Sequence, residues 1–345
     1  MLLWVSTRLM GYVQNVRLKH PVIYLLAGLM LSAGVFTGFA VGGTAWTLIP
    51  AAVIAAAAII EIRHVAFRRR HRIPPLPSAH TLGRIRRPVG SVQPAVLRHQ
   101  IELPPWRGRP FTVLHLSDLH IDRWFPAEWF ADSVRRLAAM KPDLVFLTGD
   151  AVNRKGDLAR AEEVLKPLAA IAPSYAVLGN HDFWLDAGLV TGCLGRAGFT
   201  VLRNEARRVD VAGGAILLSG CDEPWDDIPW RAPDPRGLPL FVLVHTADGF
   251  AKYSAAGANA VFAGHYHAGQ VRVPAIGPLL MPSVNGRRFD HGHFVLGGAH
   301  LLISAGLGTE YPPPRIFCRP DVFEVEIRPA PALAAQRGSP QGELP

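Results

Sequence analysis

Short apolar runs alternate with longer amphipathic segments along most of the chain. The short runs are rich in β-branched residues and predict strands, whereas two longer segments place apolar residues at helical spacing with charged outer faces. This alternation predicts an α/β domain with largely buried sheets. The predicted strands are Phe111–Leu116, Asp143–Leu147, Tyr175–Leu178, Ala215–Leu218, Leu240–Val244, Ala260–Ala263 and Leu301–Ser304, with Val96–Leu103 as a candidate first strand, and the predicted helices are Ala127–Met140 and Ala159–Ala170.

The N-terminal part has a different pattern. Residues 21–60 form a run of 40 positions without a charged side chain or a histidine. One helical span needs about 20 residues, so the run predicts two transmembrane helices, Val22–Val41 and Thr44–Ile62, that turn at Gly42-Gly43. A secretory signal has an apolar core of only about 7–15 residues and is the weaker interpretation. A buried hairpin in a soluble core is the other alternative.

The basic charge is concentrated next to this apolar run. The net charge is +9, yet the 235 residues after position 110 hold 22 basic and 25 acidic side chains. A long anionic polymer needs a basic track, so no nucleic-acid partner is expected for the globular part. Because basic residues flank both ends of the run and none lies in its turn, the positive-inside rule places both ends, and the domain that follows, on the cytoplasmic side of a bacterial-type inner membrane. Export of the domain is the alternative.

These patterns divide the chain into five segments. The three cysteines lie far apart and form no CxxC pair, so they indicate neither a disulfide framework nor a thiolate zinc site. The expected segments are a cytoplasmic N-terminal segment (1–20), two transmembrane helices (21–62), a basic proline-rich linker (63–95), a globular domain (96–328) and a disordered tail (329–345).

Polar residues follow the predicted strands at the points where ligands gather in open α/β sheets. Carboxylate, imidazole and amide groups in such positions suit a pair of divalent metal ions. A glycine precedes the polar residue at three of these strand ends and allows a sharp turn. Any one of these residues alone is more often structural, but five motifs on successive strand ends reinforce one another. They are Asp118 with His120, Asp150, Asn180 with His181 and Asp182, His245, and His265 with His267.

In this order the motifs DxH, GD, GNHD, a lone histidine and GHxH resemble the calcineurin-like metallophosphoesterases, from about Val96 to Ile327. The resemblance is strongest to the YkuE-like branch of bacterial membrane-associated or exported phosphodiesterases. That branch also carries an Ala/Gly-Gly-Gln continuation, here Ala268-Gly269-Gln270, and a late G-x-G…P-R segment, here Gly306-Leu307-Gly308 followed by Pro314-Arg315. Two positions depart from the family pattern: Tyr266 replaces a usual Thr, and Ala268 replaces a usual Gly.

The resemblance implies a four-layer αββα sandwich of two mixed sheets and a centre of two divalent metal ions, such as Mn, Fe or Zn. A hydroxide held between the metals would attack phosphorus, His181 would stabilise the phosphoryl oxygens or protonate the leaving group, and Asp182 would orient its neighbours. Asp150 would bridge the metals. The first metal would be bound by Asp118, His120, Asp150 and His267, and the second by Asp150, Asn180, His245 and His265.

The expected substrate is a phosphate ester, most plausibly a phosphodiester or diphosphate of an amphiphilic or lipid molecule, because the predicted anchor keeps the domain near headgroups. Arg287, Arg288 and Arg315 are the candidate substrate contacts. Two other functions stay open: a non-catalytic, metal-stabilised membrane scaffold, and a nuclease or phosphomonoesterase of the same fold. A scaffold would have no need of His181, and the charge balance of the domain disfavours a nuclease.

Overall fold

The computed structural model describes residues 62–76, 94–123, 125–273, 277–309 and 315–330, together with the isolated positions 55, 58 and 59. The predicted N-terminal segment, almost all of the predicted transmembrane hairpin and the tail from residue 331 lie outside these residues. Within the described part, no helix combines the length and the apolar character that a membrane crossing requires.

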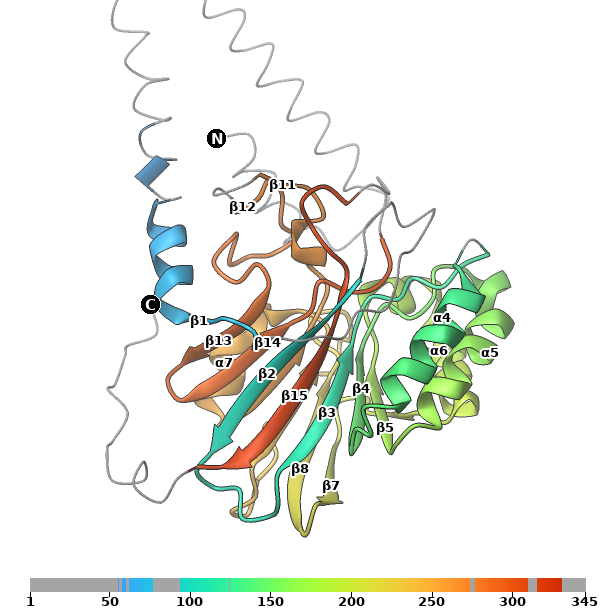
Figure 1. Ribbon diagram of the computed structural model, residues 1–345, viewed down its shortest axis with the longest axis horizontal. Coiled ribbons are helices and arrows are strands. Elements are labelled where there is room, and N and C mark those ends of the chain that lie inside the picture. The colour runs from blue at the N-terminus through green and yellow to red at the C-terminus, as the bar shows by residue number, and fades with distance from the viewer. Residues whose placement is uncertain are drawn as a thin grey trace, which may run out of the picture.

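Two mixed sheets form the body of the domain, which confirms the α/β class (Figure 1). In the first sheet, β15 pairs in parallel with β2 and antiparallel with β3. Its order is β2 (Ala95–Leu103), β15 (Asp321–Pro329), β3 (Phe111–Leu116), β4 (Leu144–Thr148), β5 (Ser174–Val177) and β6 (Thr200–Val201). The second sheet has the order β1 (Arg72–Ile73), β13 (Gly292–Leu296), β14 (Ala299–Ile303), β10 (Ala260–Ala263), β9 (Leu240–Val244), β8 (Gly214–Cys221) and β7 (Ala206–Val211).

The two sheets face each other, and helices cover their outer faces. Successive side chains of a strand point to opposite faces, so Val113 of β3 joins the core between the sheets while Leu114 joins the core beneath the helices. The helices α4 (Ala127–Ala138), α5 (Leu158–Ala169) and α6 (Asn180–Ala197) cover the first sheet (Figure 1), and α7 (Phe250–Ala255) covers the second. Helix α4 buries Phe130, Val134 and Leu137, three or four positions apart, on one face.

Residues 62–76 belong to the folded domain, although the sequence pattern indicated a linker there. Positions 62–71 are helical, and β1 pairs antiparallel with β13. The side chain of Phe67 packs edge-on against Phe289, with ring centroids 5.5 Å apart. The buried carboxylate of Asp290 accepts hydrogen bonds from Arg72 at 2.6 Å and from Arg272 at 2.8 Å. This ion-pair cluster joins β1 to the loop before β13, 218 positions further along the chain.

Four histidines are largely enclosed by the fold: His99, His115, His293 and His300. The rings of His99 and His293 lie 5.4 Å apart, and His99 also packs on Phe323. Burial lowers the pKa of His99 to about 4, of His115 to about 3 and of His300 to about 4. Neither ring nitrogen of His99 has a hydrogen-bond partner among the described residues. These side chains are therefore neutral in the folded protein near neutral pH.

We expect the free energy of unfolding to fall as the pH drops below about 6.5, because the unfolded chain then takes up protons that the folded chain excludes. For His99 the effect amounts to about 2 kcal/mol at pH 5 and is complete near the folded pKa of about 4. His99→Phe should reduce this pH dependence and leave the fold intact at pH 8. Urea unfolding of the full chain in detergent at pH 5 and pH 8 measures the free energy of unfolding. An equal pH dependence in wild type and variant would contradict the assignment of His99 as a neutral side chain in the folded protein.

Candidate metal centre

The fold brings the carboxyl ends of strands from both sheets to one place. β3, β4 and β5 run parallel in the first sheet, and β9 and β10 run parallel in the second. The predicted ligands follow these strands directly, and α6 begins at Asn180. His265 is half-buried, and the other six predicted ligands are buried: Asp118, His120, Asp150, Asn180, His245 and His267.

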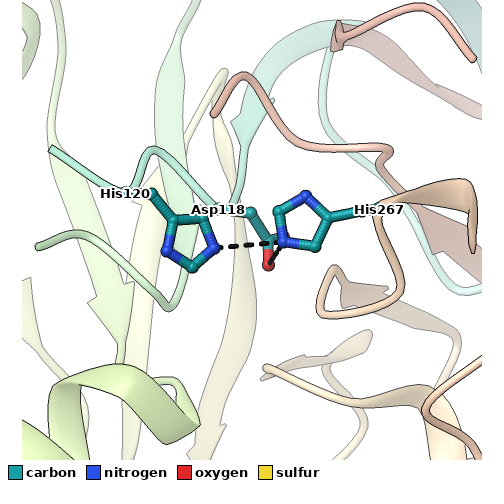
Figure 2. A group of neighbouring side chains, drawn as sticks. All are labelled: Asp118, His120 and His267. Atoms are coloured by element: carbon teal, nitrogen blue, oxygen red, sulfur yellow. Dashed lines mark hydrogen bonds and ion pairs between the residues drawn. The ribbon is translucent and has the colours of Figure 1, made fainter. Parts of the chain in front are cut away.

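The side chains form three overlapping groups that could hold metal ions, with the ligand atoms of each group within 4.8 Å of one another. In the first group, His267 Nε2 lies 3.0 Å from His120 Nε2 and 3.5 Å from an oxygen of Asp118, and all three side chains point to a common centre (Figure 2). Asp150 belongs to the other two groups, which are His120, Asp150 and His181, and Asp150, His245 and His265.

Asp150 has the position that a bridging ligand requires. Its Oδ2 lies 3.6 Å from His120 Nε2 and 3.2 Å from His245 Nε2, so one oxygen stands between the two imidazoles. Its Oδ1 accepts a 2.8 Å hydrogen bond from the backbone N–H of His181. The carboxylate is thereby fixed with Oδ2 turned toward the ligand cluster.

The backbone at the ligands adopts a conformation that is uncommon for residues with a side chain. Positive φ angles occur at Asp118 (50°), His120 (47°), Asp150 (53°), His265 (69°) and His267 (47°). Each costs on the order of 1–2 kcal/mol. Such strain gathers at functional sites, where the surrounding structure imposes it.

Close packing also explains the glycine before one ligand pair. A Cβ at Gly264 would lie 1.8 Å from Ser117 Oγ and 2.2 Å from Asp118 Oδ2. The backbone N–H of the next residue, His265, donates to both oxygens of Asp118, at 3.1 and 3.0 Å. Only glycine lets the two ligand loops approach this closely.

The donor atoms fit divalent cations. Asn180 Oδ1 and His245 Nε2 have no hydrogen-bond partner among the described residues, although buried polar atoms are normally paired. The Nε2 atoms of His120 and His267 point toward each other. Converging carboxylate, amide and imidazole lone pairs are the set that Mn²⁺, Fe²⁺ and Zn²⁺ accept. The residues present therefore fit a dinuclear site.

The outer nitrogens of two imidazoles are held by hydrogen bonds. His120 Nδ1 lies 2.7 Å from Asn153 Oδ1, and His245 Nδ1 lies 2.7 Å from the carbonyl oxygen of Thr148. Both partners are acceptors, so each ring holds a proton on Nδ1, and Nε2 is turned toward the cluster as the atom that could bind a metal. Sequence reasoning missed Asn153, although its place three positions after Asp150 was a usable signal.

Burial and charge oppose each other across the cluster. Burial raises the pKa of Asp118. Burial would also raise the pKa of Asp150, but His245, His181 and His120 hold it well below its ordinary value. Burial alone would lower the pKa of His245, yet Asp150 and Asp118 raise it to about 9. The two carboxylates therefore attract positive charge to this point, as a cation site must.

His181 and Asp182 lie in different surroundings. The half-buried ring of His181 lies between His120 and Trp184, with centroid distances of 4.7 and 4.8 Å. Asp182 is fully buried and accepts hydrogen bonds from the backbone N–H groups of Gly179 at 2.9 Å and Ala151 at 3.1 Å. It ties the loop after β4 to the loop after β5, which suits the orienting role expected for it.

Arg315 lies behind a ligand instead of on an open surface. Its guanidinium is buried, donates to the carbonyl oxygen of Ala305 at 2.7 Å and lies 3.2 Å from His267 Nδ1. It also donates to the carbonyl oxygens of Gly306 and Gly308. These bonds join Arg315 to the His267 loop and to the segment 305–308, and its contact with a substrate stays a prediction.

The other two predicted substrate arginines lie near helix 62–71. Arg287 donates to the carbonyl oxygen of Pro278, and Arg288 stacks over the ring of Phe67 at 5.1 Å. On another side of the ligand cluster, Trp225 packs edge-on against both His245 and His265, with centroid distances of 5.3 Å.

We expect Asn153→Ala to weaken divalent metal binding by roughly 10–100-fold, because the Nδ1 proton of His120 loses its acceptor. Asn259→Ala is the matched control, since Asn259 Oδ1 accepts a hydrogen bond from Leu240 at the opposite end of β9 from His245. Calorimetric Mn²⁺ titration of the metal-stripped full chain measures the affinity. Equal Mn²⁺ affinities in the two variants would show that the hydrogen bond from His120 to Asn153 has no role in metal binding.

The region that holds the predicted metal ligands matches known proteins. Residues 111–269 match the family described as Calcineurin-like phosphoesterase. The chain is 32% identical over 238 residues to Phosphodiesterase YaeI of Escherichia coli (strain K12), which covers 67% of this chain and 87% of YaeI. It is 27% identical over 224 residues to the uncharacterized metallophosphoesterase YkuE of Bacillus subtilis (strain 168), covering 61% of this chain and 77% of YkuE.

A solved structure, TT1561 of Thermus thermophilus, is similar with a TM-score of 0.37 at 10% identity, covering 57% of this chain and 89% of that one. On the identity with YaeI and the matched family region, the chain belongs to the calcineurin-like phosphoesterase family and is a metal-dependent phosphoester hydrolase.

Proposed function

We propose that this enzyme is anchored in a membrane and hydrolyses a phosphodiester or diphosphate bond of an amphiphilic, lipid-like substrate. The proposal rests on the position of helix 62–71 in the structure. This helix follows the uncharged run 21–60 almost directly, and its Arg68 reaches the β11–β12 hairpin (Arg272–Val273 and Gly277–Pro278), where Arg68 Nη2 would lie 3.4 Å from a Cβ at Gly277. The hairpin begins five positions after the ligand His267.

Two further observations support the substrate class. YaeI carries the name phosphodiesterase, which favours a diester over a monoester for this chain. Arg287 and Arg288 lie between the hairpin and helix 62–71, where a basic side chain beside an anchored segment would attract an anionic headgroup. A lipid is locally concentrated at such a site, whereas a soluble nucleotide is not.

The chain's own residues divide the work of hydrolysis. Bound to the seven ligands, a pair of divalent cations would supply an activated water molecule and neutralise charge on the phosphoryl group. Asp150 holds the two halves of the ligand set together through Oδ2. His181 lies on the half-exposed side of the cluster, where its ring can donate a hydrogen bond to a phosphoryl oxygen or a proton to the leaving oxygen.

Replacing a metal ligand and replacing His181 should have different effects on bound metal and on turnover. Asp150→Asn removes the bridging charge and should cost both bound metal and rate, whereas His181→Ala should keep the metals and lower turnover by about 10²–10⁴. Metal content by mass spectrometry and turnover on a soluble diester, measured on the same samples, separate the two. Full loss of metal from His181→Ala would place this residue among the ligands instead.

The substrate proposal is tested with the full chain in detergent micelles. A lipid phosphodiester, a lipid-linked diphosphate, a small soluble diester and a monoester are offered with each of Mn²⁺, Fe²⁺ and Zn²⁺. We expect a lipid substrate to give the highest kcat/KM, and Arg287→Ala with Arg288→Ala to lower the ratio of lipid to soluble turnover. Arg207→Ala on the exposed face of β7 is the matched control.

Each other result assigns a different function. Equal turnover of the small diester and of every lipid, together with no effect of the arginine exchanges, would reject the lipid proposal. Preference for the monoester would indicate a phosphomonoesterase. Tight metal binding without turnover of any substrate would favour the scaffold function.

A further inference from the structure

Three apolar side chains are exposed around the loop that carries the ligand His267. Phe317 is 74% exposed, the highest value among the large apolar side chains of the described residues, and Ile316 and Leu280 are 44% and 38% exposed. We call these three residues the apolar rim. An exposed cluster of this kind beside a functional site indicates an interaction surface.

Backbone hydrogen bonds place the rim directly against the ligand loop. Ile316 forms two with the segment 270–272, of 2.9 and 3.0 Å, and Leu279 forms a third with the same segment at 3.0 Å. The two segments that carry the rim therefore lie on either side of residues 270–272, which begin three positions after His267. A molecule that covers the rim would lie next to the metal centre.

The rim is held outward by the fold. The backbone of Phe317 has φ +48°, which costs a bulky residue on the order of 1–2 kcal/mol. Arg315, two positions before it, and Cys318, directly after it, are buried, so the chain is held on both sides of the exposed segment 316–317. On the other side, a Cβ at Gly269 would lie only 2.7 Å from the carbonyl oxygen of Leu280, so this contact is also close-packed.

Basic side chains accompany the rim. Helix 62–71 touches the β11–β12 hairpin through Arg68, and it exposes Arg63, Arg69 and Arg70. Its first residue, Ile62, is 67% exposed, and that end of the helix points toward the same end of the molecule as β11 and β12 (Figure 1). Exposed apolar side chains next to guanidinium groups match the boundary between acyl chains and anionic headgroups.

We propose that the apolar rim inserts into the interface of an anionic bilayer and so brings the His267 loop to the level of the headgroup phosphates. The inference rests on the proposed function for its membrane anchor and adds the surface that docks. Its occupant is the lipid of the bilayer itself. The insertion would fix which side of the domain faces the membrane.

The first test measures where residue 317 lies. Phe317→Cys is spin-labelled in the full chain and reconstituted into phosphatidylcholine–phosphatidylglycerol vesicles; the three native cysteines are buried, and labelled wild type serves as the blank. Collisions with oxygen, which dissolves in lipid, are compared with those of a water-soluble nickel chelate. Leu189→Cys, on α6 and 45% exposed, is the control.

We expect the label at 317 to shift strongly toward oxygen when the lipid is added and the label at 189 to remain accessible to nickel. Equal accessibility at both positions would overturn the proposal. Spin–spin broadening at 317 would also overturn it, since it would show a second copy of the chain on the rim.

The second test measures the consequence for turnover. Phe317→Ser combined with Leu280→Ser removes most of the apolar surface and should lower the ratio of vesicle-embedded to soluble diester turnover by at least about tenfold. An unchanged ratio would contradict the insertion. If wild type cleaves no lipid while the label at 317 still lies in lipid, the proposed substrate fails and the docking surface stands.

Discussion

The fold gathers buried negative charge at Asp150, and the other parts of the site are arranged around this carboxylate. Asp150 is almost fully buried and shares its Oδ2 between imidazoles that come from the two sides of the site. Taking a charge out of water is costly unless an opposite charge accompanies it. Asp118 is buried in the same space, so two carboxylates face histidines that turn Nε2 toward them. Divalent cations would supply the opposite charge at this point, and the ligand loops are arranged around it.

The fold supplies that arrangement from elements far apart in the chain. Parallel strands from both sheets end at the same edge, and the ligand loops after β3, β4 and β10 turn sharply through positive φ angles. Hydrogen bonds from backbone N–H groups then lock the carboxylates, as His181 does for Asp150 and His265 for Asp118. Arg315 and Asp182 brace the loops from behind. The strain of the individual turns is tolerable because the packed sheets fix both ends of each loop.

The sequence predicted the site better than the fold around it. Strand ends carry local signals, so the order of the ligands and strands such as Phe111–Leu116 and Leu240–Val244 could be predicted from periodicity and motif. Helix α6 was not predicted, because three glycines, Gly188, Gly192 and Gly195, lower its helical propensity and tertiary packing stabilises it instead. The docking of residues 62–76 depends on Asp290, 218 positions beyond Arg72, which no local pattern reveals. The direction of the Arg315 guanidinium is likewise set by packing alone.

The ligand set suits two divalent cations, with Asp150 between them. Anomalous diffraction from crystals of the enzyme grown with Mn²⁺, with data collected above and below the manganese absorption edge, would locate both ions. We expect two anomalous peaks roughly 3.5–4 Å apart, one beside Asp118, His120 and His267 and the other beside Asn180, His245 and His265, with Asp150 between them. A single peak, or peaks at other residues, in a crystal of active enzyme would contradict this expectation.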